Sequence, residues 1–200
     1  MPTDIPAIRQ LVAAEIPAAA LTLAEAFHDD PLKSFLAGGK ELTTKRVLPF
    51  FDAFIRIQLP HELVYTTPAH EAIALWAPPG EWKLPITKVL RYAPRFLKLY
   101  GLRFIPNLQV LTDLEKLHPE EPHYYLEILG TSPAHQGKGF GRALMEPMVE
   151  RAEREGVGLY LESSKESNVA FYGRFGFQVR TEMTHRRNGP TQWLMWRDPR

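Results

Sequence analysis

The chain has 200 residues, 24 Lys and Arg against 23 Asp and Glu, a formal net charge of +1, and no cysteine. This length suits a single domain with a proper hydrophobic core, and the balanced charge gives no reason to expect a nucleic-acid partner. The lack of cysteine excludes disulfides, thiolate nucleophiles and cysteine-ligated zinc, and it is compatible with the cytoplasmic location that we expect. No apolar run approaches the roughly 18 residues of a spanning helix, so no membrane partner is expected.

The beginning of the chain predicts a short strand and two helices. Residues 7–12 give a weak strand signal. A helix then opens with Pro17 in its first turn and ends before Pro31, and its apolar positions, Leu21 among them, should face the core. The second helix covers residues 41–59, where Pro49 should break or bend it early.

A hairpin and a helical segment follow. Residues 63–67 and 72–76 predict two strands joined by a tight turn. Residues 80–119 predict helices split by three prolines, Pro85, Pro94 and Pro106, with basic residues among leucines. A basic amphipathic helix can lie on a membrane or a partner, but an ordinary helix with a solvated basic face is the stronger interpretation.

The central part of the chain predicts a strand, a glycine-rich loop, a helix and a second strand. The strands cover residues 123–129 and 158–162, and the helix runs from 142 to 156. Such a unit is a right-handed crossover between parallel strands. Two closing strands are predicted on either side of the turn at 188–190.

The glycine-rich loop is a candidate anion site, because backbone N–H groups converge at the start of a helix and the helix dipole favours negative charge. Gly137, Gly139 and Gly141 allow close approach of a phosphate. A P-loop is excluded because Gly139, not Ser or Thr, follows the Gly-Lys pair. The dinucleotide fingerprint is excluded because Arg142 stands where its third glycine belongs.

Two segments together resemble the GNAT superfamily of acyl-CoA N-acyltransferases. The spacing Gln136-x-x-Gly139-x-Gly141 between a strand and a helix is similar to the superfamily's pyrophosphate loop. The segment from Asn168 through Tyr172 to Gly176-Phe177 resembles the segment that follows the second central strand in this superfamily. Features across residues 119–200, including Pro147 inside a helix, also look like the puromycin N-acetyltransferase-like branch.

The resemblance implies an α+β fold of three layers, with a mixed central sheet and helices on both faces. It implies one GNAT domain over residues 1–200, with a helical insertion at about 80–119. It also implies acetyl-CoA as co-substrate, no metal, and a monomer or homodimer.

The resemblance carries cofactor-binding roles onto the end of the first central strand, the loop and the following helix. Asn168 corresponds to the residue that contacts the pantetheine arm, and a free amide N–H at Gly130, a position that suits a bulge, would polarise the thioester carbonyl. The full cofactor-binding set is Leu129, Gly130, Thr131, Gln136, Gly137, Lys138, Gly139, Phe140, Gly141, Arg142, Asn168 and Tyr172. For Lys138 and Arg142, a solvated basic side chain is the competing interpretation.

The resemblance makes Tyr172 the general acid that protonates the departing thiolate, and a phenol pKa near 10 permits this. The base is open between Glu127 and Glu162, acting directly or through water, and each is equally well explained as a structural residue. Regular strand alternation places Glu127 on one face with Tyr125 and Leu129. Burial there would raise its pKa.

Asp29 and Asp30 lie in the loop where the superfamily receives acceptors, and they are candidates for attracting a cationic amine. A polar turn that ends a helix explains them as well. The expected function is direct transfer of an acetyl group from acetyl-CoA to a primary amine of a small molecule, such as an antibiotic or nucleoside-like compound. The alternatives are a protein or peptide N-acetyltransferase and a non-catalytic acyl-CoA-binding regulatory protein.

Overall fold

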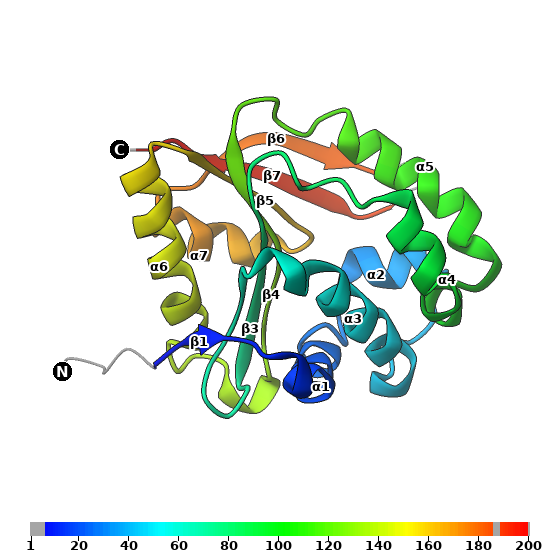
Figure 1. The fold of residues 1–200 in the computed structure, drawn as a ribbon. Helices are drawn as coiled ribbons and strands as arrows, with labels where there is room; N and C mark the ends of the chain where they lie inside the picture. The colour runs from blue at the N-terminus through cyan, green and yellow to red at the C-terminus, as the bar shows by residue number, and fades with distance from the viewer. Residues whose placement is uncertain (1–6, 186–188, 200) are drawn as a thin grey trace.

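The computed structural model describes residues 7–185 and 189–199 (Figure 1). Its strands are β1 (Arg9–Gln10), β2 (Val64–Thr66), β3 (Ala72–Ala77), β4 (His123–Thr131), β5 (Gly158–Ser163), β6 (Gln178–Thr184) and β7 (Thr191–Arg197). Its α-helices are α1 (Ile16–Ala26), α2 (Pro31–Leu36), α3 (Thr44–Gln58), α4 (Ile86–Tyr100), α5 (Phe104–Glu115), α6 (Phe140–Glu155) and α7 (Val169–Gly173). The turn predicted at 188–190 lies partly outside the described residues.

Within the described residues, seven strands form one mixed sheet in the order β1-β2-β3-β4-β5-β7-β6. The pair β4 and β5 is parallel and is joined through α6, so the predicted crossover is confirmed. The two strands pair only from His123↔Gly158 to Leu126↔Leu161. Beyond that point β4 stays with β3 and β5 stays with β7, so the sheet opens between them.

A β-bulge lies in β4 at Glu127. The register with β3 steps from Leu75↔Ile128 to Trp76↔Leu126, which leaves Glu127 as the extra residue. The extra residue interrupts the alternation of faces. The expectation that Tyr125, Glu127 and Leu129 share a face is therefore wrong, because Leu129 packs with the Leu126 cluster and Tyr125 packs with Tyr160 and Leu194.

The bulge is not at Gly130, where the sequence analysis placed it. Gly130 pairs regularly with Ile73 in β3. A Cβ at this position would come within 2.7 Å of the Leu23 side chain in α1, so glycine is needed here for close packing of the helix on the strand.

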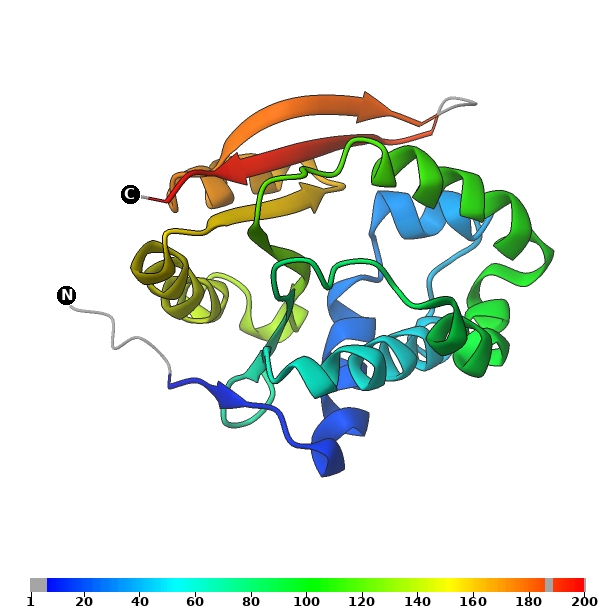
Figure 2. The ribbon, with the colours of Figure 1, turned by 45° about the horizontal axis from the view of Figure 1, so that its top comes forward.

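Helices cover both faces of the sheet (Figures 1 and 2). Helices α1 and α3 pack on one face, around a core that includes Leu23, Phe51 and Ile73. Helix α6 packs on the other face, with Leu144 and Met148 buried. Helix α4 packs on α3, outside the first layer. The predicted three-layer α+β architecture with helices on both faces is confirmed.

Several predicted helices differ from the observed ones. Helix α2 was missed, because the prolines and aspartates around it indicated only a turn. Pro49 and Pro94 lie inside continuous helices α3 and α4, where each removes a single backbone hydrogen bond while buried neighbours such as Phe51 and Phe96 hold the helix. Leu21 is 43% exposed instead of facing the core.

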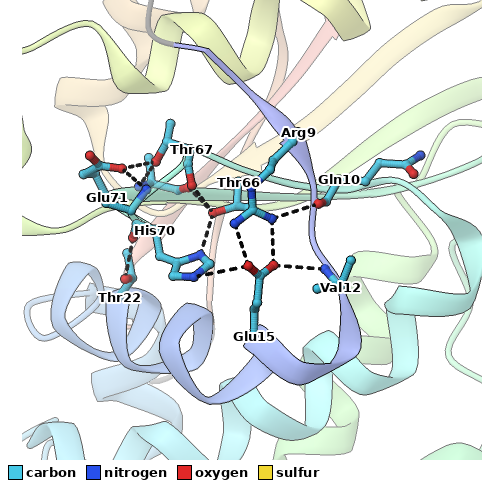
Figure 3. Close-up of polar contacts among 11 residues, drawn as sticks. Arg9, Gln10, Val12, Glu15, Thr22, Thr66, Thr67, His70 and Glu71 are labelled. Carbon is cyan, nitrogen blue, oxygen red and sulfur yellow. Dashed lines mark hydrogen bonds and ion pairs between the residues drawn. The ribbon is translucent and has the colours of Figure 1, made fainter.

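A polar network ties β1 to α1 and to the turn between β2 and β3 (Figure 3). Arg9 donates to both carboxylate oxygens of Glu15 at 2.7 and 2.6 Å, and this contact lowers the pKa of Glu15 to about 2. His70 bonds to Thr66 at 3.2 Å, and its backbone carbonyl accepts from Thr22 in α1 at 2.6 Å. The network fixes α1 against the sheet edge, and α1 in turn covers the end of β4. Among the described residues, no helix has the length and apolar character to cross a membrane.

Candidate active site

A cavity of about 1000 Å³ lies where β4 and β5 separate. Its walls come from five parts of the chain: β4 over 125–131, the end of β5 and the next residues over 161–165, the loop and first two turns of α6, helix α7, and the α1–α2 segment. Leu114 of α5 and Gln192 of β7 complete the lining. The opening of the sheet therefore brings together most of the predicted site residues, which lie up to 142 positions apart, from Asp30 to Tyr172.

The glycine-rich loop forms one end of the cavity. Gly137 and Gly139 have φ of 77° and 86°, a left-handed conformation that favours glycine, and Gly139 is the N-cap residue of α6. Open space lies where a Cβ would stand at either position. The N–H groups of the first turn of α6 have no partner within the helix, so this end of the cavity can receive an anion.

The basic side chains of the loop differ in where they point. Arg142 lines the cavity and pairs with Glu146 at 2.6 Å. Lys138 turns its amine to the Ala134 carbonyl at 2.9 Å, so this contact does not aim its charge into the cavity. Gln136 donates to the Thr131 carbonyl at 3.3 Å and ties the loop to the end of β4.

Helix α7 supplies Tyr172, and the turn before it supplies Asn168. Both residues line the cavity, Asn168 exposed and Tyr172 8% exposed. Burial raises the pKa of the Tyr172 phenol, so it stays protonated. Phe171 and Phe175 also line the cavity, and both are half-buried against the core cluster around Leu144.

Glu127 reaches the cavity from the bulge. Its Oε1 accepts a hydrogen bond from Nε2 of Gln58 in α3 at 2.5 Å, and its Oε2 is buried without a hydrogen-bond partner. Burial raises the pKa of Glu127 well above its usual range, against the smaller lowering effects of Gln58 and the charge of Lys88. Gln58 was not singled out from the sequence, because nothing local marks a contact across 69 positions.

Glu162 reaches the cavity from β5. Its Oε1 accepts a hydrogen bond from the Tyr160 hydroxyl at 3.0 Å. Burial raises the pKa of Glu162 to about 7, while hydrogen bonds from Tyr160 and Tyr125 act in the opposite direction. A carboxyl group with this pKa changes its protonation state near neutral pH, which suits proton transfer.

The two aspartates have different surroundings. Asp29 binds Lys165 at 2.6 Å on the surface and is absent from the cavity lining. Asp30 lines the cavity and is 4% exposed, but one of its oxygens caps α2 through the Lys33 N–H at 2.6 Å and the other accepts from Ser164 at 2.5 Å. Asp30 therefore connects the start of α2 to the end of β5. Among the described residues, no group of three His, Asp or Glu side chains is arranged to hold a metal ion.

Residues 100–177, which include the loop and α7, match the model of the Acetyltransferase (GNAT) family. An uncharacterized N-acetyltransferase of Schizosaccharomyces pombe is 29% identical over 187 residues, covering 86% of this chain and 74% of the relative. This part of the chain is therefore similar to GNAT-type N-acetyltransferases. The GNAT family uses acetyl-CoA, and the enzyme class is therefore an acetyl-CoA-dependent N-acetyltransferase.

Solved structures support the fold of this N-acetyltransferase. A structure described as histone acetyltransferase HPA2 and related acetyltransferase from Corynebacterium glutamicum has a TM-score of 0.68 at 24% identity, covering 98% of this chain and 97% of that one. A Drosophila melanogaster polyamine N-acetyltransferase, described as catalysing the formation of N-acetylagmatine, has a TM-score of 0.67 at 16% identity, covering 96% and 99%. The chain thus has the GNAT fold.

Proposed function

We propose that the chain transfers an acetyl group from acetyl-CoA to a primary amine of a small molecule, by direct transfer in a ternary complex. The observation that carries this proposal is the shared cavity: a carboxyl group from each separated strand and the ring of Tyr172 line the same space. A base, an acid and an anion-binding loop around one cavity are the groups that acyl transfer between a thioester and an amine needs.

The loop suits the pyrophosphate of acetyl-CoA. The open space at Gly137 and Gly139 lets phosphate oxygens approach the backbone, and the cavity continues from the loop to the two glutamates. Residues 129–131 and 136–142 and Asn168 would hold the molecule, with Lys138 the weakest member because its amine contacts Ala134. When bound, acetyl-CoA supplies an acetyl group activated as a thioester.

Different side chains of the cavity carry out the two proton transfers. Glu162 or Glu127 takes a proton from the amine as its nitrogen bonds to the acetyl carbon. The Tyr172 phenol, which burial keeps protonated, donates its proton to the sulfur as the carbon–sulfur bond breaks. The products are then an N-acetylated amine and free CoA thiol, and the proton taken by the glutamate returns to Tyr172 through solvent.

A small acceptor is supported by the solved structure named for polyamine acetylation, and an antibiotic or nucleoside-like amine fits the resemblance to the puromycin N-acetyltransferase-like branch. A protein or peptide acceptor is the second candidate, because another structure of the same fold is named as a histone acetyltransferase. In either case α5 lies at the cavity through Leu114, where it would limit the size of an acceptor.

The test is release of CoA thiol from acetyl-CoA against a panel of puromycin, aminoglycosides, polyamines, arylalkylamines and peptides. We expect turnover with one class of small amine and a large loss of turnover in Tyr172→Phe. Preferred turnover of peptides would replace the small-molecule proposal. Binding of acetyl-CoA with no turnover on any amine would contradict the proposed function.

A further inference from the structure

Gln58 and Glu127 form a polar contact behind the cavity. Gln58 ends α3 and is 1% exposed, and it does not itself line the cavity. One hydrogen bond joins the pair, from Gln58 Nε2 to Glu127 Oε1 at 2.5 Å. The second oxygen of each side chain, Gln58 Oε1 and Glu127 Oε2, is buried with no hydrogen-bond partner.

Two unpaired oxygens on the two sides of one hydrogen bond have a simple explanation. A carboxylate can only accept hydrogen bonds, so an ionised Glu127 leaves Glu127 Oε2 and Gln58 Oε1 both unpaired, and a buried polar group without a partner is destabilising. A proton on Glu127 Oε2 turns this oxygen into a donor for Gln58 Oε1. The amide and the acid then exchange two hydrogen bonds and satisfy both groups at once.

The other groups around Glu127 do not offset its burial as an anion. Lys88 of α4 is the nearby cation that favours the ionised form, but its amine donates to the Ile57 carbonyl at 3.2 Å. The charges of Glu162 and Glu127 both raise the pKa of Tyr125 in β4, and the hydrogen bond of Tyr125 goes to Glu162. Burial is the largest influence on Glu127 and favours the neutral acid.

A neutral Glu127 changes the charge that the cavity offers to an acceptor. Glu162 remains to receive the proton of the reacting amine. Asp30 is engaged by the Lys33 N–H and by Ser164, and the Lys33 ammonium lines the same cavity, 4.4 Å from the centre of the Phe27 ring. Glu146, the remaining carboxylate of the lining, pairs with Arg142 at 2.6 Å. No carboxylate is then left without a partner for a second ammonium group among the cavity residues described, whereas Phe27, Leu32 and Leu114 offer apolar surface.

We propose that Gln58 and Glu127 form a neutral amide–acid pair, that Gln58 is its positioning residue, and that the cavity consequently selects monoamines with an apolar body over diamines and polyamines. The selectivity part rests on the proposed function. The protonation part is a property of the resting protein and is tested without turnover.

The first experiment compares acceptors matched in length, hexylamine with hexamethylenediamine, and phenethylamine with its analogue that carries a second aminomethyl group on the ring. We expect kcat/KM to be at least tenfold higher for each monoamine. In Gln58→Glu two carboxyl groups share one proton and add one negative charge, so the ratio of diamine to monoamine kcat/KM should rise about tenfold. The uncharged control Gln58→Met should leave that ratio at the wild-type value. Wild-type preference for the diamines, or equal ratios in the Glu and Met variants, would overturn the selectivity.

The second experiment is carbon-13 NMR of the protein labelled at the glutamate carboxyl carbons, with Glu127→Gln used to assign the signal. We expect the Glu127 carboxyl carbon to keep the chemical shift of a protonated acid at pH 7. A chemical shift typical of an ionised carboxylate at pH 7 would contradict the neutral amide–acid pair. This result does not depend on whether Gln58→Glu folds. If no amine is acetylated, the proposed function and the selectivity fall together, and the NMR signal still decides whether the pair exists.

Discussion

The Tyr160→Phe substitution tests whether Glu162 is the base. The Tyr160 hydroxyl donates to Glu162 Oε1 at 3.0 Å and stabilises the ionised carboxylate, which opposes the raising effect of burial. The ring is 1% exposed, and removal of one oxygen leaves its packing in place. The substitution should therefore raise the pKa of Glu162 above its value of about 7 without unfolding the protein.

The size of the shift follows from the hydrogen bond that is lost. A hydrogen bond to a charged group contributes roughly 1.5 kcal/mol or more, and each pKa unit corresponds to about 1.4 kcal/mol, so the shift is about one unit upward. A base must be ionised to accept a proton, so the acidic limb of the kcat profile moves from about pH 7 to about pH 8. At pH 7 the ionised fraction falls from about a half to about a tenth, which lowers kcat roughly fivefold, and the two enzymes converge above about pH 9.

The assay is CoA-thiol release at saturating substrates from pH 5.5 to pH 9.5. Tyr124→Phe is a matched control, because that hydroxyl donates at 2.5 Å to Glu155 of α6, a carboxylate outside the cavity lining. The control should keep the wild-type acidic limb. An unshifted limb in Tyr160→Phe would refute Glu162 as the base. A water molecule would then be the candidate, or Glu127 if the NMR experiment shows it to be ionised.

Three further predictions concern the acid, the loop and stability. Tyr172→Phe should lower kcat by about 100-fold or more while acetyl-CoA affinity, measured by calorimetry, stays nearly unchanged; full activity would exclude Tyr172 as the acid. Gly139→Asp places a Cβ at a φ of 86° and a negative charge at the anion end, so acetyl-CoA binding should be lost, and unchanged binding would mean that the loop has another role. The free energy of unfolding of Glu162→Gln, measured with urea, should increase by roughly 2 to 3 kcal/mol relative to that of wild type between pH 5 and pH 8. The sign follows because the folded pKa of Glu162, about 7, exceeds its ordinary 4.5, so wild type loses stability as the pH rises from 4.5 to about 7. Equal pH dependence of the two proteins would contradict the raised pKa.

Local patterns were sufficient for the parts of the site that depend on short segments. The strand, glycine loop and helix over residues 123–156 were predicted from hydrophobic periodicity and the glycines, and the parallel pairing of β4 with β5 followed from the crossover. Asn168 and Tyr172 were placed at the cavity by their resemblance to one family segment. These features persist because their geometry is set by residues within one or two turns of each other.

Errors arose where distant segments meet. The bulge at Glu127 comes from the register between β3 and β4, which alternation within β4 alone does not reveal. Pro49 and Pro94 remained inside helices because burial against the neighbouring layers outweighs one lost hydrogen bond.

The sequence by itself determined the glycine-rich loop, the segment that carries Asn168 and Tyr172, and the parallel crossover from β4 to β5, because these depend on residue types at short spacing. Only the tertiary structure decided how the carboxyl groups differ. Gln58 reaches Glu127 from α3, 69 positions away, while Tyr160 and Tyr125 meet Glu162 where β4 and β5 still pair. A pKa depends on burial and on neighbours in space, and the sequence does not state those neighbours until the chain is folded.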